Sequence, residues 1–408
     1  MLAERAVSVL GLIAMIAIAW LFSTDRRRVP WRIVGWGVAI QLALGVVLLK
    51  TAAGAPFFNG MNALARALIA YTEAGSRFVF GSLVDTGFSL VIHVLPIIIF
   101  MGSVFAVLYH LGIMQRVVDV LSTALSRTMR TSGAESLAAV ANLFLGMTES
   151  ALLVKPYLER MTRSELFLLM TMGMATVAGS VMLSYVGMLG GGDYAGHLAT
   201  ASLLSAPAGI LISKVMIPET ETPETFAKSR TTRQTSSVNV IDAAAQGALA
   251  GMRLAAYVGA LLLAFVALIA LLNASIATVG SWFGAGDLSL QKLLGLALAP
   301  VAWLLGVPWE DASQVGALLG MKTVLNEFIA YGELADLMAA NALAPRSAVI
   351  ASYALCGFAN FGSLAILLGG IGGLAPSRRP EVAQLGLRSI LSGSLATFMT
   401  GCVAGILV

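Results

Sequence analysis

Charged residues are scarce in this sequence. Only 11% of its 408 residues are Asp, Glu, Lys or Arg, whereas 58% are hydrophobic. Soluble domains usually carry about 25% charged residues, so the composition excludes a soluble globular domain and indicates an integral membrane protein. The net charge of +4 is small, and we expect no nucleic-acid partner.

Cysteine and histidine are scarce as well. Cys356 and Cys402 both lie in apolar sequence, which argues against a disulfide framework. His93, His110 and His197 are dispersed and lack the spacing of metal ligands. The sequence shows no Ser/His, Asp/Asp or HExxH constellation. An intramembrane enzyme acting on a polar or lipid-linked substrate is therefore only an alternative, and we do not expect an enzyme.

Long apolar runs dominate the chain. Eight of them approach or reach the ~17–25 residues that a membrane-spanning helix needs. They do not alternate as the strands of an outer-membrane barrel do. We therefore predict an all-α integral membrane protein with about eight transmembrane helices, at Ala6–Phe22, Ile33–Leu49, Leu90–Tyr109, Leu166–Met188, Leu198–Ser213, Leu254–Leu272, Val349–Gly369 and Ile390–Val408.

The basic residues indicate the orientation. Arg26, Arg27, Arg28 and Arg32 follow the first apolar run, and loops rich in Lys and Arg face the cytoplasm. The N-terminus is therefore expected outside, and eight crossings return the C-terminus to the same side. Because the triple-Arg segment stands where a signal peptide would have its cleavage site, we interpret the first run as a retained helix.

Other segments are too polar to span the membrane and too periodic to be loops. Gly60–Phe80, Ile113–Met129 and Val238–Met252 are predicted to be amphipathic helices in the membrane interface. Residues 218–237, rich in Thr, Glu and Pro, are predicted to form a cytoplasmic linker.

Two acidic residues, Glu149 and Glu327, lie in apolar stretches interrupted by glycine. A carboxylate at membrane depth costs roughly 2.5–3.5 kcal/mol, so both are candidate functional residues. The arms around each are too short to cross the membrane but long enough to reach its middle and return. We therefore predict re-entrant helical hairpins at about 135–160 and about 308–340, with tips that line a cavity.

The order of elements repeats along the chain. After the third and again after the sixth span come a further helix, a hairpin, a helix rich in small residues and a final span. The orientation makes the two repeats inverted, an arrangement typical of secondary transporters that bind a polar solute between the halves. We divide the chain into an N-terminal scaffold with an interfacial helix (1–87), a first repeat (88–217), the linker (218–237) and a second repeat (238–408).

From about Phe88 to the C-terminus the sequence resembles the concentrative nucleoside transporters, in particular the bacterial, sodium-coupled type. The similar stretches are Gly146–Ser150, Lys155–Glu165, Met174–Val181, Asn326–Tyr331, Ala354–Ser363 and Gly369–Pro376. The resemblance implies a homotrimeric symporter of the bacterial inner (plasma) membrane, with both termini periplasmic. It would import nucleosides by alternating access, and the sodium gradient would drive this import. A channel is a less favoured alternative.

The resemblance also implies the substrate-binding residues. The nucleobase would contact the first hairpin and the adjoining helix, and the ribose would contact the second hairpin and the broken helix after it. The residues implied are Met147, Thr148, Glu149 and Val181 for the base, and Glu327, Phe358, Asn360 and Ser363 for the ribose. The family usually has Gln where this chain has Met147. Because a thioether accepts weakly and donates nothing, base selectivity stays open.

A sodium site beside the first hairpin is implied in the same way. It would use Asn142, Leu145, Thr176 and Val177, through side-chain and carbonyl oxygens. Hard cations prefer such oxygens. Some members of the family couple to protons instead, which is the alternative, but a proton-coupled protein would not need the oxygen pair of Asn142 and Thr176.

Overall fold

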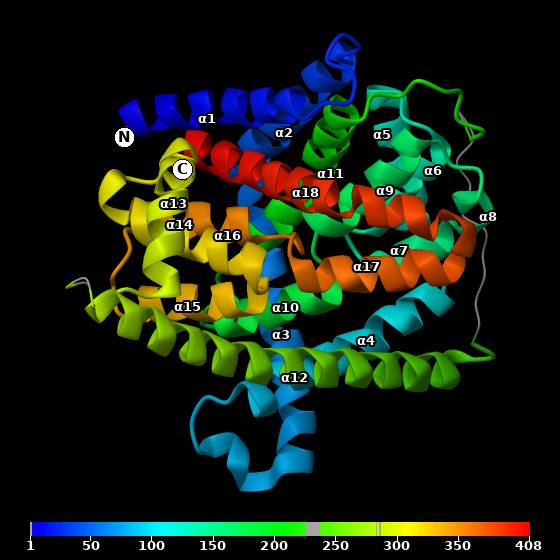
Figure 1. Cartoon of the computed structure of the whole chain (residues 1–408). Coiled ribbons are helices and arrows are strands. Elements are labelled where there is room, and N and C mark those ends of the chain that lie inside the picture. Colours follow the sequence, from blue (N-terminus) through cyan, green and yellow to red (C-terminus); the bar gives the residue numbers. More distant parts are fainter. Residues whose placement is uncertain (1, 226–236, 283, 285–286) are drawn as a thin grey trace.

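A computed structural model describes residues 2–225, 237–282, 284 and 287–408, so most of the predicted linker lies outside the described residues. The described elements are helices and short helical turns (Figure 1). In chain order they are α1 (Leu2–Leu21), α2 (Trp31–Lys50), α3 (Gly54–Phe80), η1 (Gly81–Asp85), η2 (Leu90–Val94), α4 (Leu95–His110), α5 (Ile113–Met129), α6 (Gly133–Ala141), α7 (Met147–Leu153), α8 (Lys155–Leu158), α9 (Arg163–Ala175), α10 (Gly179–Met188), α11 (Ala195–Met216), α12 (Val240–Ser281), α13 (Leu290–Leu304), α14 (Trp309–Val324), α15 (Glu327–Ala339), α16 (Pro345–Leu355), α17 (Phe361–Leu374), η3 (Pro376–Arg378) and α18 (Arg379–Leu407).

Seven helices in the described part of the chain are long and apolar enough to cross a membrane, and an eighth results if the bent pair of α13 and α14 is counted. Burial separates these helices into two groups. The candidate spans at α9–α10, α11 and α18 are 89–94% buried, whereas those at α1, α2, α4 and α12 are only 11–28% buried. The first group therefore forms the core of the fold, and the second group surrounds it.

Two expected spans are broken helices. The expected span at Val349–Gly369 consists of α16 and α17, separated by residues 356–360, which is the broken helix that the resemblance implied. The expected span at Leu166–Met188 consists of α9 and α10, separated by residues 176–178. The side chain of Asn360 caps the start of α17, because its Oδ1 accepts a hydrogen bond from the Ser363 backbone N–H at 2.7 Å. Such a cap begins a new helix instead of continuing the old one.

The separate interfacial helix expected at Val238–Met252 is also absent from the described chain, because these residues open the continuous 42-residue helix α12. This part of α12 packs directly against α4. A Cβ on Gly247 would lie 2.4 Å from the Gly102 carbonyl oxygen, and one on Gly251 would lie 2.8 Å from the Ile98 carbonyl oxygen. Small residues four positions apart allow such close contact between helices, and this contact keeps the segment in line with the span.

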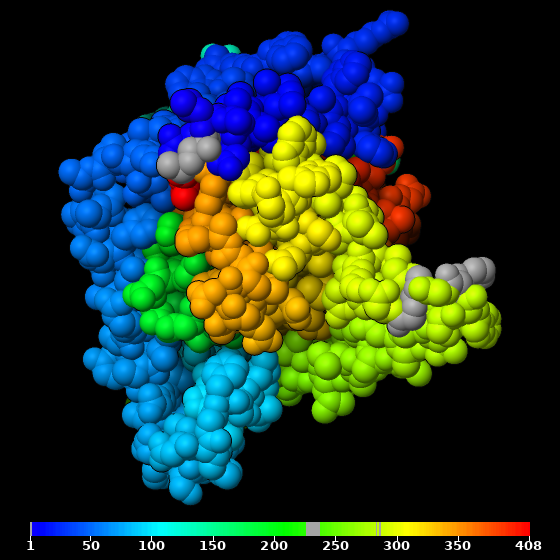
Figure 2. Space-filling view, turned by 90° about the vertical axis from the view of Figure 1, so that its left-hand side faces the viewer, coloured from blue at the N-terminus to red at the C-terminus, as the bar shows by residue number. Residues whose placement is uncertain are grey.

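The expected amphipathic helices elsewhere are present. Helix α5 has the predicted bounds, and α3 contains the predicted Gly60–Phe80 segment. Helix α3 runs crosswise to α1, α12 and α18; it passes behind the middle of the molecule in Figure 1 and lies along the left side in Figure 2. The chain termini lie at the same end of the molecule (Figure 1), where Arg5 donates a hydrogen bond to the Val408 carbonyl at 3.0 Å.

Both predicted hairpins are helical pairs with a turn between the arms. The first consists of α6, a turn at 142–146, and α7 with α8; the second consists of α14, a short turn, and α15. Ser132 and Glu135 form a capping box that starts α6, and Thr162 and Glu165 form one that starts α9. Serine or threonine followed three residues later by glutamate satisfies the first free N–H groups of a helix.

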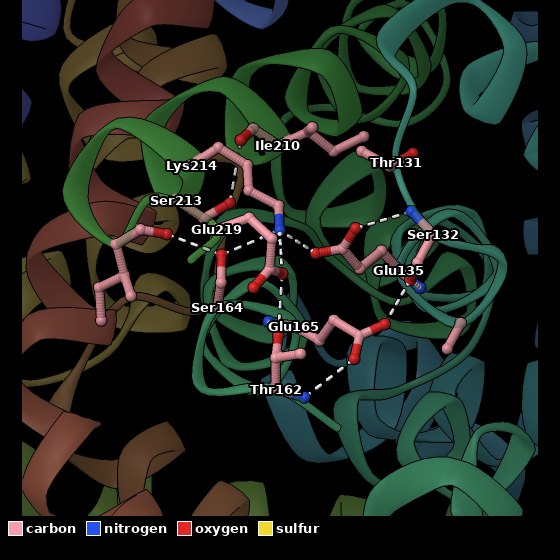
Figure 3. Close-up of polar contacts among 12 residues, drawn as sticks. Thr131, Ser132, Glu135, Thr162, Ser164, Glu165, Ile210, Ser213, Lys214 and Glu219 are labelled. Atoms are coloured by element: carbon pink, nitrogen blue, oxygen red, sulfur yellow. Dashed lines mark hydrogen bonds and ion pairs between the residues drawn. The ribbon is translucent and has the colours of Figure 1, made fainter. Parts of the chain in front are cut away.

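The capping glutamates also belong to a buried polar cluster at the base of the first hairpin (Figure 3). Lys214, on α11, forms ion pairs with Glu135 and with Glu219, the latter at 3.3 Å. Its Nζ also donates to the Ser164 hydroxyl at 2.9 Å, and the Ser132 hydroxyl donates to Glu165 at 2.6 Å. The cluster ties α6, α9 and α11 together and fixes the base of the hairpin to the core.

Candidate functional site

The tips of both hairpins open onto one cavity of about 440 Å³. Helices α4 and α12 form one wall of the cavity, and residues of α10 and α17 line it as well. All eight residues predicted to bind substrate line this cavity: Met147, Thr148, Glu149, Val181, Glu327, Phe358, Asn360 and Ser363. Residues more than 200 positions apart in the sequence therefore meet at one site, between the two repeats.

Glu327 begins α15 and is only 4% exposed. Asn326 caps the helix, because its Oδ1 accepts from the Ile329 N–H at 3.0 Å, and this fixes the backbone beside Glu327. The Tyr185 hydroxyl donates to Glu327 Oε1 at 2.8 Å, and the Asn360 side-chain amide donates to Oε2 at 2.8 Å. Each carboxylate oxygen thus has a donor, while further lone pairs remain for a ligand.

The broken helix supplies the rest of this side of the cavity. Phe358 lies in the break between α16 and α17, and Asn360 and Ser363 lie at the start of α17. Because Asn360 uses Oδ1 to cap α17 and its amide N–H to hold Glu327, one side chain fixes both the helix start and the carboxylate. Sequence reasoning placed these residues together through the resemblance alone.

Tyr185 was not predicted. It is fully buried on α10 and stacks on Tyr331 with ring centroids 4.5 Å apart. The signal that could have found it is a tyrosine in an apolar helix, since a buried phenol needs a hydrogen-bond partner. A carboxylate at the same depth is the partner that the sequence offers.

Glu149 has a different setting. It lies in the first turn of α7 and is exposed toward the cavity, so of the two acidic residues only Glu327 is buried. The Thr148 hydroxyl donates to Glu149 Oε2 at 3.0 Å. A Cβ on Gly146 would lie 2.3 Å from this same oxygen, so a larger residue at 146 would require the Glu149 side chain to move.

The four residues of the expected sodium site lie behind the first hairpin tip. Asn142 ends α6, and Thr176 ends α9. The Thr176 hydroxyl donates to the Asn142 carbonyl at 3.1 Å and to the Met172 carbonyl at 2.7 Å. Asn142, Thr176 and Val177 are buried, whereas Leu145 lines the cavity.

This arrangement fits a small hard cation. The C-terminal ends of α6 and α9 meet here, and the last carbonyls of a helix lack partners within the helix. Helix C-termini also carry partial negative charge. The Phe144 carbonyl accepts from the Gly179 N–H at 3.2 Å, which joins the turn of the hairpin to the break between α9 and α10.

Comparisons with known proteins identify the family. Residues 10–83 and 197–405 match the family models described as the N-terminus and C-terminus of Na⁺-dependent nucleoside transporters, and residues 91–192 match one described as nucleoside recognition. The nucleoside permease NupC of Helicobacter pylori is 38% identical, over 98% of this chain and 97% of its own length. The chain belongs to the Na⁺-dependent nucleoside transporter family.

Solved structures of a relative resemble this transporter closely. CNTnw in an inward-facing, substrate-bound state is 44% identical and covers 99% of this chain and 98% of its own, with a TM-score of 0.92. A double variant of CNTnw in an outward-facing state is 42% identical and covers 100% and 99%, with a TM-score of 0.94. The predicted fold class is thereby confirmed, and the chain is a multi-pass membrane transporter and not an enzyme.

Proposed function

We propose that this transporter imports nucleosides together with Na⁺, and that the cavity between the hairpins is the substrate site. The observation that carries the proposal is the Glu327 carboxylate, buried at the cavity wall and held by Tyr185 and Asn360. A carboxylate held in this way accepts hydrogen bonds from two neighbouring hydroxyl groups. The vicinal hydroxyls of a ribose match that requirement.

The residues around Glu327 complete the proposed ribose half of the site. Asn360 and Ser363 provide an amide and a hydroxyl beside the carboxylate, and both line the cavity. Phe358 offers an apolar ring from the break between α16 and α17. Polar side chains beside an aromatic ring suit a sugar, because a sugar has hydroxyl groups at its edge and apolar C–H groups on its faces.

The nucleobase would lie against the first hairpin and α10, at Met147, Thr148, Glu149 and Val181. The Thr148 hydroxyl and the Glu149 carboxylate offer polar contacts to the edge of the base. Met147 and Val181 offer an apolar surface to its face. Because Met147 donates no hydrogen bond, the base is read by fewer direct contacts than a glutamine would allow.

Sodium is the coupling ion, as the family is Na⁺-dependent, and we assign it to Asn142, Leu145, Thr176 and Val177. The ion is co-transported, so it enters with the substrate. Each Na⁺ that enters gains about 2.3 kcal/mol per 100 mV of membrane potential. That gain alone corresponds to roughly 50-fold accumulation of the nucleoside.

The proposed mechanism is alternating access. The two hairpins with α9–α10, α11 and α16–α18 would form the mobile transport unit, and α4 and α12 would belong to the scaffold.

Exposed aromatic residues on α3, Tyr71 (66%) and Phe78 (92%), lie on the segment proposed for contacts within a homotrimer. We place the transporter in a bacterial inner membrane with both termini periplasmic, because the Arg-rich loop at 26–32 then faces the cytoplasm.

Uptake of labelled uridine into proteoliposomes tests the proposal. An inward Na⁺ gradient should drive accumulation above equilibrium, and replacement of Na⁺ by choline should abolish it. Accumulation driven only by an inward proton gradient would support the proton-coupled alternative. Equilibration without accumulation would support a channel, and chemical conversion of the uridine would support an enzyme. Absence of uridine uptake under every gradient would overturn the proposal.

A further inference from the structure

Lys322 is a fully buried lysine on α14, five residues before Glu327 in the second hairpin. Its Nζ donates to the Ala354 carbonyl at 2.8 Å and to the Thr397 hydroxyl at 2.8 Å. The same nitrogen lies 5.8 Å from the centroid of the Phe398 ring. One ammonium group thus joins the hairpin to α16 and to α18.

The partners of Lys322 suit a positive charge. Ala354 lies in the last turn of α16, where carbonyls lack partners within the helix and the helix dipole is negative. The Thr397 hydroxyl donates to the Ser394 carbonyl at 3.0 Å, so a lone pair of its oxygen is free to accept from Lys322. An aromatic ring within about 6 Å adds a cation–π attraction.

These contacts satisfy the ammonium but leave its charge uncompensated by a directly bound carboxylate. A buried charge without compensation is costly, which raises the question of what Lys322 does. Lys322 lies in the last turn of α14, and Glu327 begins α15 directly after the short turn between the two helices. The contacts of Lys322 therefore fix the end of α14 that leads into the residue proposed to hold the ribose.

A similar place exists in the first repeat. There the end of α9, the first half of a broken helix, faces the first hairpin through Asn142 and Thr176. In the second repeat the end of α16, also the first half of a broken helix, faces the second hairpin through Lys322. The first place offers neutral oxygens, whereas the second contains a lysine side chain of the protein itself.

We propose that Lys322 is a positioning residue for substrate recognition: by fixing the end of α14 on α16 and α18, it holds Glu327 in place for the ribose hydroxyls. The inference rests on the nucleoside recognition by Glu327 proposed above. Lys322 itself does not line the cavity, so it acts on the substrate only through Glu327.

The test compares a nucleoside that has ribose hydroxyls with one that lacks them. Dissociation constants of uridine and 2′,3′-dideoxyuridine are measured for the purified full-length transporter in saturating Na⁺. Lys322→Met should weaken uridine binding about tenfold, a change of 1.4 kcal/mol, and leave dideoxyuridine binding within about twofold. Thr323→Val, on the same helix and away from the cavity, is the matched control and should change neither constant. If Lys322→Met does not yield folded protein, Thr397→Val replaces it and should weaken uridine binding about threefold by removing one acceptor of the ammonium.

A double variant completes the test. If Lys322 acts through Glu327, Lys322→Met should have little further effect in a Glu327→Gln background, because the two changes then share one cause. Equal weakening of uridine and dideoxyuridine by Lys322→Met would show a purely structural role and overturn the inference, as would no change in either. If Glu327→Gln alone leaves uridine binding unchanged, the proposed ribose site itself fails, which is a separate outcome.

Discussion

The two hairpin tips present their glutamates in opposite ways. Glu327 is buried and receives hydrogen bonds from Tyr185 and Asn360, whereas Glu149 is exposed toward the cavity beside Thr148. The second hairpin therefore presents a carboxylate already fixed in place, and the first presents one that a ligand must still order. A fixed group loses less conformational freedom on binding, so we expect the second hairpin to contribute more to affinity.

The bases of the hairpins differ as well. The first hairpin is anchored by the buried Lys214 cluster (Figure 3). The second begins near Asp311, whose carboxylate accepts from the Ser347 hydroxyl at 2.5 Å and from the Ala344 N–H at 3.0 Å and is only partly buried. The hairpin whose glutamate is exposed thus has the buried ion-pair cluster at its base.

The largest expected effect concerns that base. Lys214→Met would leave Glu135 as a buried carboxylate without its ion-pair partner, which typically costs 3–5 kcal/mol. We expect a clear fall in the melting temperature of the purified transporter. Lys155→Met, which removes an exposed lysine from α8 of the same hairpin, is the control. An unchanged melting temperature in Lys214→Met would show that the cluster does not anchor the hairpin.

The next effect concerns the fixed tip. Glu327→Gln would replace the proposed charged hydrogen bonds to the ribose by neutral ones, and charged bonds are worth about 1.5–3 kcal/mol. Uridine should bind roughly 10- to 100-fold more weakly, as measured by calorimetry. Glu333→Gln, at an exposed position of the same helix, should bind uridine normally. Normal uridine affinity in Glu327→Gln would remove the basis of the ribose site.

A smaller effect is expected at the other tip. Glu149→Gln changes an exposed group that is not fixed before binding, so uridine affinity should fall by about 1 kcal/mol, or roughly fivefold. The same binding assay measures it. A loss larger than that of Glu327→Gln would reverse the comparison between the two hairpins.

The smallest expected effect concerns how the nucleobase is recognised. Met147→Gln supplies an amide at the cavity wall, and a new hydrogen bond to the base should improve uridine affinity by about 0.5–1.5 kcal/mol. Met147→Leu, which supplies no donor, should leave affinity nearly unchanged. Equal uridine affinities for the two variants would mean that the nucleobase does not contact residue 147.

Much of this architecture was predictable from the sequence, because membrane spans follow from length and hydrophobicity and the hairpins follow from arms too short to cross. The break at 356–360 was implied by the resemblance alone, since Asn360 acts as a cap in a run that is otherwise apolar enough to span. The full length of α12 was missed because its polar first turns are stabilised by glycine contacts with α4. Tyr185 and Lys322 were missed because their partners are distant in sequence.

The most direct test of the account measures uridine affinity with and without Na⁺ in three proteins. In the wild type, Na⁺ should tighten uridine binding, because the proposed sodium site lies beside the first hairpin and coupling between two ligands is reciprocal. Glu327→Gln should keep this sodium effect at a lower overall affinity, whereas Thr176→Val should lose it. Wild-type affinity that stays the same when choline replaces Na⁺ would contradict the account.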